Sequence, residues 1–146
     1  MAFVLGKDCK LYRNTGSFGT PAWNEIPNVK DLAKNFETSE ADVTTRGNNG
    51  WEATVPALNR GSIDFQMVYD TADAGFVAIR DAYLNKTPVE YAVMDGDITV
   101  SGKQGLRATC MVINFSMTQN LEEAVTVDVS IKPTYAANAP FWYTVP

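Results

Sequence analysis

Residues 62–70 read Ser62-Ile63-Asp64-Phe65-Gln66-Met67-Val68-Tyr69-Asp70, and this stretch decides the fold class of the chain. Apolar side chains recur at every second position, and the polar Ser62, Asp64 and Gln66 alternate with them. Successive side chains of a strand point to opposite faces, so this pattern is typical of a strand with one buried face. The stretch therefore predicts a half-buried strand with Asp64 and Gln66 on its polar face.

The residues that follow predict the one helix of the chain. Within residues 71–85, apolar side chains fall at helical spacing on one stripe: Phe76, Ile79, Tyr83 and Leu84. Asp70 or Thr71 stands where a side chain caps a first turn, and Pro88 follows where a helix has to stop.

Most of the remaining sequence predicts strands, at residues 9–14, 29–37, 51–58, 89–95, 98–100, 106–118 and 124–131. Within residues 106–118 the apolar positions change phase, which predicts either a twist between two cores or a bulge near Cys110. The order of elements predicts a mainly β fold, an antiparallel sandwich or barrel of about seven to eight strands with one packed helix. We expect residues 1–146 to form it as a single domain.

Two segments lack the periodicity of core elements. Residues 38–50 are polar and end in Gly47-Asn48-Asn49-Gly50, which predicts a long loop or an extended hairpin arm. Residues 136–146 carry Phe141, Trp142 and Tyr143, which are predicted to extend beyond the last strand as an aromatic arm. Both segments are candidate contacts with other protein copies. The alternative for the tail is that Trp142 folds back and plugs the end of the core.

The composition excludes several kinds of active site. The chain has no histidine, so Ser-His-Asp and Cys-His mechanisms are impossible. Its two cysteines, Cys9 and Cys110, are too few for a zinc site of nitrogen and sulfur ligands. Residues 95–97 and 101–105 resemble calcium and phosphate loops only faintly, and we expect turns there. A hydrolase that uses carboxylates alone stays open, but we expect no enzyme, no cofactor and no metal.

Charge and hydropathy limit the partners of the chain. The net charge is −5 and the basic residues are scattered, so the grouped phosphate contacts of a nucleic-acid-binding protein are not expected. No apolar stretch approaches the ~20 residues that cross a bilayer, and the first residues lack the basic region of a signal peptide. We expect two free thiols and no membrane association.

The order of strand, polar loop, strand, single helix and C-terminal meander resembles the tail tube proteins of long-tailed, non-contractile bacteriophages, the lambda-like major tail proteins. The likeness covers roughly residues 29–135. It is carried by Val29-Lys30-Asp31-Leu32, by the loop that ends at Trp51-Glu52-Ala53-Thr54, by residues 62–69 and by the last hairpin.

This resemblance implies a β-sandwich with one helix whose copies form stacked, hexameric rings, with the sheets joined into an inner barrel that conducts DNA during ejection. The implied partners are copies of the chain itself and the tape-measure, tail-tip and tail-terminator proteins. DNA would pass without specific binding, and no membrane is involved. The implied location is the tail of the virion, after assembly in the cytoplasm of a bacterial host.

On this interpretation the polar segment and the tail make the contacts between rings, through Glu40, Asp42, Arg46, Asn48, Asn49, Trp51, Phe141, Trp142 and Tyr143. Asp64 and Gln66 are the candidates to face the lumen. Tube proteins of contractile tails and of type VI secretion-like systems are similar in fold and stay open. So does a β-sandwich module that binds carbohydrate or a cell surface through exposed Trp and Tyr.

Overall fold

The computed structural model describes residues 3–146. All eight strands belong to one antiparallel sheet in the order β2-β1-β5-β6-β7-β4-β3, and β8 pairs with the first residues of β6. The elements are η1 (Gly6–Asp8), β1 (Lys10–Asn14), β2 (Trp23–Glu25), β3 (Val29–Asp42), η2 (Arg46–Asn48), β4 (Thr54–Val68), α1 (Ala74–Asn85), β5 (Val89–Met94), β6 (Gln104–Thr118), β7 (Thr126–Pro133) and β8 (Phe141–Thr144). The mainly β fold with one packed helix is confirmed.

The main core lies between α1 and both halves of the sheet, which bends around the helix. Leu11 and Tyr91 from the β1–β5 half share one buried cluster with Phe65 and Ile131 from the β4–β7 half. Phe76 of α1 belongs to the same cluster. A smaller cluster on the other face of β1 and β5 contains Met94 and Val145 among others.

The alternation predicted for residues 62–70 is confirmed over β4. Ile63, Phe65 and Met67 are buried, whereas Asp64 and Gln66 lie on the opposite face. The predicted strands at residues 51–58 and 62–70 are one continuous strand, because residues 59–61 keep pairing with β3.

The helix begins three residues later than predicted. The Asp70 carboxylate accepts a hydrogen bond from the backbone N–H of Ala72 and so closes a turn before the helix. Asp73 is the N-cap, since its side chain accepts from the N–H of Phe76 at 3.2 Å. At the other end Lys86 takes a left-handed conformation (φ 54°), and the helix stops before Pro88 as predicted.

The phase change in β6 is a bulge, one of the two outcomes left open. The register with β7 shifts between Val112 and Asn114, so Cys110 and Val112 face the core before the shift and Phe115 packs against it after the shift. The predicted strand at residues 98–100 is wrong. The Asp97 carboxylate accepts hydrogen bonds from the N–H and hydroxyl of Thr99, which makes a turn instead.

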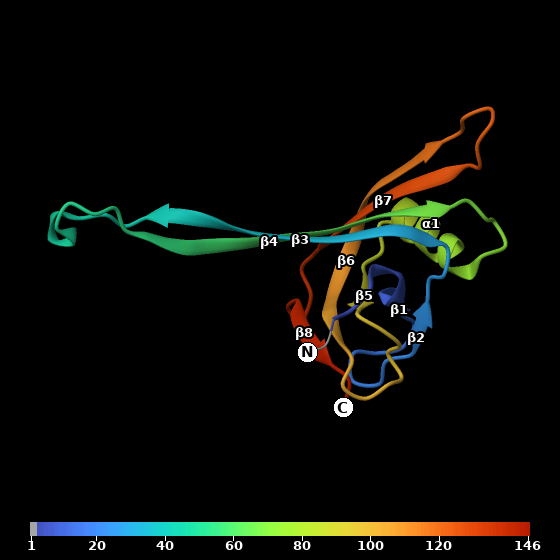
Figure 1. Ribbon diagram of the computed structural model, residues 1–146, viewed down its shortest axis with the longest axis horizontal. Coiled ribbons are helices and arrows are strands. Elements are labelled where there is room, and N and C mark those ends of the chain that lie inside the picture. Colours follow the sequence, from blue (N-terminus) through green and yellow to red (C-terminus); the bar gives the residue numbers. More distant parts are fainter. Residues whose placement is uncertain (1–2) are drawn as a thin grey trace.

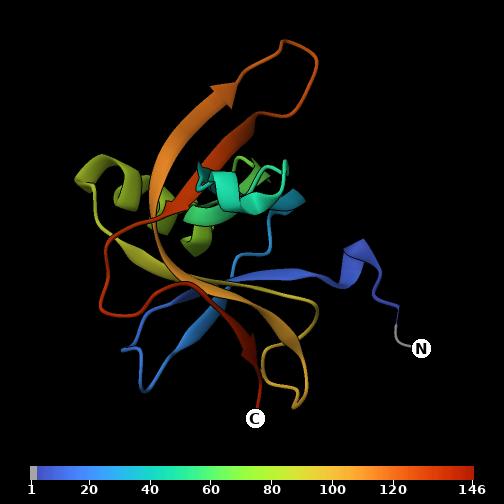
Figure 2. The same ribbon diagram turned by 90° about the vertical axis from the view of Figure 1, so that its left-hand side faces the viewer.

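Of the two readings of residues 38–50, the hairpin arm is the correct one. Strand β3 continues to Asp42 and pairs with β4 from Thr54 onwards, with η2 in the connecting turn. Figure 1 shows this hairpin as a long arm that projects away from the rest of the molecule, and Figure 2 views the arm end-on.

Gly105 permits the close approach of β5 and β6. A Cβ atom at this position would lie 2.0 Å from the carbonyl oxygen of Val93 and 2.7 Å from Cα of Met94. Both are backbone atoms, so no side-chain rotation relieves the clash.

We therefore predict that Gly105→Ala lowers the free energy of unfolding by at least about 2 kcal/mol, because the β5–β6 pairing has to shift. Urea unfolding of the monomer measures it. The control is Gly19→Ala, whose Cβ would meet no atom within 4 Å and should change stability by less than about 0.5 kcal/mol. Equal stability of the two variants would contradict the close approach.

Candidate assembly interface

Strands β3, β4, β7 and the second half of β6 form a four-stranded region with a polar face opposite the core. The strand registers place Ala33, Asp64, Ser130 and Asn114 in one row across this face. The next row contains Gln66, Asp128 and Ser116. We call these residues the polar face.

Hydrogen bonds hold the carboxylates of the polar face in place. Asn35 donates to Asp64 at 2.9 Å, and Gln66 donates to Asp128 at 3.1 Å. Ser62 also donates to Asp64. The sequence-predicted Asp64 and Gln66 thus belong to a wider acidic and polar surface.

This four-stranded region has a free strand edge on each side. Among the described residues 3–146, strand β3 ends the strand order and pairs only with β4. On the other side, β5 pairs with β6 only as far as Cys110, so residues 111–118 of β6 pair with β7 alone. Ile113, on this second edge, is 55% exposed. Free edges carry unpaired backbone N–H and C=O groups and readily accept another strand.

The arm formed by β3, η2 and β4 exposes a series of apolar side chains: Phe36, Val43, Trp51, Val55 and Leu58. The predicted contact residues Glu40, Asp42, Arg46 and Asn49 are also exposed on it, and Asn48 is half-buried. Asn49 has a φ of 55° and so needs the left-handed conformation that Asn tolerates. An isolated two-stranded hairpin is marginally stable in water, so a neighbouring surface is expected to cover it.

The tail differs from the prediction, because Phe141, Trp142 and Tyr143 do not extend beyond the last strand. They form β8, which pairs with residues 104–107 of β6. Phe141 and Tyr143 are half-buried, whereas Trp142 is 57% exposed and donates from its indole N–H to Gln104. Val145 is buried in the smaller cluster, so the tail folds back over the core.

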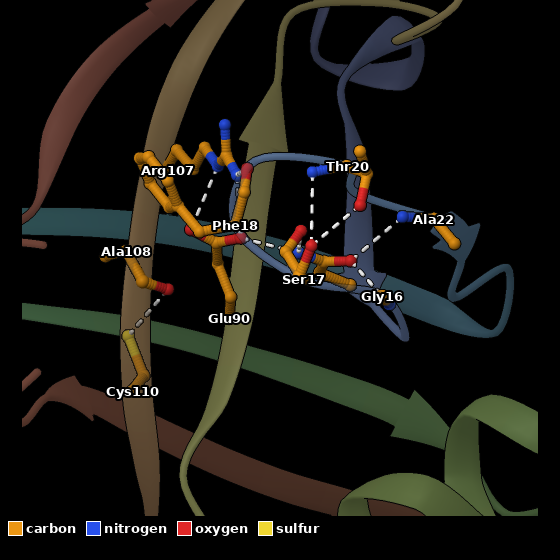
Figure 3. A network of polar contacts seen from close by, with 10 residues as sticks. Gly16, Ser17, Phe18, Thr20, Ala22, Glu90, Arg107, Ala108 and Cys110 are labelled. Carbon is orange, nitrogen blue, oxygen red and sulfur yellow. Dashed lines mark hydrogen bonds and ion pairs between the residues drawn. The ribbon is translucent and has the colours of Figure 1, made fainter. Parts of the chain in front are cut away.

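Arg107 holds this tail and the loop after β1 against the sheet. Its side chain is buried and pairs with Glu90 through Nε at 2.9 Å and Nη2 at 3.0 Å. Nη2 also donates to the carbonyl oxygen of Phe18 at 2.7 Å, as Figure 3 shows in part. The guanidinium carbon lies 4.1–5.6 Å from four ring centroids, those of Phe18, Trp23, Phe141 and Tyr143.

We predict that Arg107→Met lowers the free energy of unfolding by about 3–5 kcal/mol, because it leaves the Glu90 carboxylate buried without its partner. The double variant Arg107→Met, Glu90→Gln should recover part of that loss. Arg80→Met, which breaks an exposed pair with Asp81, is the control and should cost less than about 1 kcal/mol. A double variant no more stable than Arg107→Met would contradict the buried-charge explanation.

Burial changes the acidity of two further groups in this half of the sheet. It raises the pKa of Tyr91 well above its usual range and raises the pKa of the Cys110 thiol to about 12. Both cysteines are free, as predicted, with Cys9 exposed and Cys110 buried.

Among residues 3–146 no group of three or more His, Cys, Asp or Glu is arranged to hold a metal ion. Within residues 3–146, no helix combines the length and the hydrophobicity needed to span a membrane.

Asp128 and the Arg107 network were not among the residues predicted from the sequence. The alternation of residues 126–131 places Asp128 on the outward face. Pairing this strand with the alternating strand at residues 62–70 could therefore have identified Asp128. No sequence signal links Arg107 to Glu90 and four aromatic rings. Nor does the structure bring Trp51 and Trp142 together: Trp51 follows η2 at the end of the arm, and Trp142 lies in β8 on the body (Figure 1).

Comparison with known families decides the identity of the chain. The family model described as "Phage tail tube protein" matches residues 6–134. The chain belongs to the phage tail tube protein family. Members of this family are structural proteins of the tail tube. A comparison with curated protein sequences found no match to this chain.

Solved structures share the fold of this tail tube protein. The tail of an empty GTA particle, refined with helical and C6 symmetry, matches with a TM-score of 0.74 at 17% identity, over 96% of this chain and 98% of that one. The SPP1 tail tube matches with a TM-score of 0.70 at 17% identity, over 88% of this chain and 74% of that one. A chain in the baseplate of the anti-feeding prophage matches with a TM-score of 0.64 at 8% identity, over 99% of this chain and 98% of that one. These likenesses show the tail-tube fold.

Proposed function

We propose that this protein forms stacked hexameric rings whose joined sheets make the inner wall of a phage tail tube, through which DNA leaves the virion. The observation that carries this proposal is the four-stranded region with its polar face and two free edges. Family membership supports the structural role, and the C6 symmetry of the GTA tail supports six copies in a ring.

Strand directions support a closed barrel. Within the region β6, β7, β4 and β3 each run antiparallel to the next, so β3 and β6 also run in opposite directions. When identical copies stand side by side around an axis, the free edge of β3 can therefore pair in antiparallel fashion with residues 111–118 of β6 in the neighbour. Such pairing removes both free edges.

The size of the surface supports assembly as well. The chain exposes 9485 Å², whereas a compact monomer of its mass would expose about 7,400 Å². The excess is more than twice the roughly 800 Å² that one partner buries in a protein–protein interface of standard size. The arm and the β6–β7 hairpin both project from the body, in different directions (Figure 1), so both are available to other copies.

The acidic polar face suits a wall along which DNA slides. Asp64 and Asp128 repel phosphates, and no lysine or arginine belongs to the rows of the polar face. We propose that the arm, through Glu40, Asp42, Arg46, Asn48, Asn49 and Trp51, contacts the adjacent ring. Of the tail aromatics we propose this role for Trp142 alone, since Phe141 and Tyr143 are engaged around Arg107.

The finer assignments are part of the same proposal. The order of elements in the sequence favours a long, non-contractile tail of the lambda-like kind over a contractile or secretion-like tube. The expected partners are tape-measure, tail-tip and tail-terminator proteins, and assembly is expected in the cytoplasm of the bacterial host. We expect no enzymatic activity.

Self-assembly is the first test. Concentrated protein, alone or with its tape-measure and tail-tip partners, should form rings or tubes in negative-stain electron micrographs. Ile113→Lys places a charge on the free edge of β6 and should abolish rings while leaving the melting temperature unchanged. Leu84→Lys, on the exposed end of α1, is the matched control and should still assemble. Monomers at every concentration by light scattering, with partners present, would contradict the proposal.

The second test concerns the electrostatics of the polar face. Wild-type tubes should not bind duplex DNA at physiological salt, whereas tubes of Asp64→Lys, Asp128→Lys should retain short duplexes with a steep salt dependence. Asp8→Lys, Asp81→Lys makes the same change of net charge at other exposed sites and should retain less DNA. Equal retention by both double variants, measured by co-sedimentation, would show that the polar face does not line the DNA path.

A further inference from the structure

The loop at one end of the β6–β7 hairpin is apolar and acidic. Residues 119–125 connect the two strands, and Figures 1 and 2 both show this loop extending beyond the rest of the molecule. Leu121 is 100% exposed, and the following Glu122 and Glu123 are exposed as well. Asn120 donates to the Glu123 carboxylate at 3.1 Å, which holds one of the two charges in place. We call residues 119–125 the hairpin tip.

A groove with the opposite charge lies at the base of the arm. Its volume is about 810 Å³, and its lining includes Phe36, Arg60, Gly61, Lys132, Pro133 and Pro140. Phe36 is 60% exposed and its ring covers the Cα of Gly61, where a Cβ would be 3.5 Å from the ring. We call this hollow the arm-base groove.

The arm-base groove has an excess of positive charge. Arg60 and Lys132 are exposed on it, against the single carboxylate of Glu37. Within residues 3–146, neither Arg60 nor Lys132 forms an ion pair, and neither do Glu122 and Glu123 of the hairpin tip. Both surfaces therefore keep their charges available to another molecule.

The registers place these two surfaces at opposite ends of β7. Thr126 at its start pairs with Thr118 beside the hairpin tip, whereas Pro133 at its end pairs with Cys110 beside the groove. The eight residues of β7 rise about 26 Å between them. Two complementary surfaces at opposite ends of a subunit make a heterologous, head-to-tail contact, which repeats along an axis.

We propose that the hairpin tip of each copy docks into the arm-base groove of a copy in the next ring. Leu121 packs against Phe36 and the flanking prolines, and Glu122 and Glu123 pair with Arg60 and Lys132. This inference rests on the proposed tube function and specifies which surfaces join successive rings.

The charges also set the direction of stacking. Two hairpin tips that meet bring four carboxylates together, and two grooves that meet bring their cations together. Both arrangements are repulsive, so only the head-to-tail order brings opposite charges together. Every ring then points the same way along the tube.

Disulfide cross-linking tests the contact between the hairpin tip and the arm-base groove. Cysteines are introduced at two exposed positions, where substitution is expected to leave the fold intact. Leu121→Cys and Phe36→Cys are introduced together in a Cys9→Ser background. Cys110 stays, because its burial and raised pKa keep it unreactive. Oxidised tubes of the double variant should give a ladder of covalent multimers on a non-reducing gel. Either substitution alone should give no ladder, and a mixture of the two single variants should give dimers.

Charge reversal provides the second measurement. Glu122→Lys, Glu123→Lys and, separately, Arg60→Glu, Lys132→Glu should each reduce the fraction of protein in tubes at least tenfold while rings persist. Combining all four substitutions should restore tubes. Asp8→Lys, Asp81→Lys makes the same change of net charge as Glu122→Lys, Glu123→Lys and should form tubes normally.

The outcomes separate the two proposals. Tubes without cross-linked multimers, or tubes of normal length in both reversal variants, would overturn the docking contact and leave the tube function standing. Wild-type protein that forms neither rings nor tubes would contradict the tube function, and the docking contact with it.

Discussion

A strand edge exposes a row of backbone N–H and C=O groups, and the arrangement of this chain depends on two such edges being left free. Strand β3 is unpaired on one side of the polar region, and residues 111–118 of β6 are unpaired on the other. Helix α1 covers the apolar face between them, so that the edges and the polar face of this region remain available. Pairing each β3 with the β6 of a neighbour satisfies both edges and turns the polar face toward a common axis.

The buried Arg107 fixes the geometry of the body of the subunit. Its guanidinium forms an ion pair with Glu90, donates a hydrogen bond to the Phe18 carbonyl oxygen and lies among four aromatic rings. These contacts join the loop after β1 and strand β8 to the centre of the sheet. A buried ion pair is rigid but costly to desolvate, so it defines a geometry more than it adds stability. Fixing β8 in this way turns Phe141 and Tyr143 inward and leaves Trp142 at the surface.

The sequence predicted the features that depend on short-range periodicity. The alternation over residues 62–70 and the helix around Phe76 and Ile79 follow from the spacing of apolar side chains. The phase change within residues 106–118 indicated either a twist or a bulge, and the strand register decided for the bulge. Features that depend on single polar groups were not predictable. Hydrogen bonds to the Asp97 side chain form a turn where a strand was predicted. The Arg107 guanidinium contacts aromatic rings from three separate segments of the chain. Of the candidate site, Asp64 and Gln66 were accessible from alternation alone, whereas Asp128 required knowledge of the strand register.

An electron cryomicroscopy reconstruction of assembled tubes tests the central claim most directly. The account predicts that Asp64, Gln66 and Asp128 line the lumen, that β3 of each copy continues the sheet into β6 of the next, and that α1 lies on the outside of the wall. A map in which α1 faces the lumen, or in which the edge of β3 borders solvent, would contradict it.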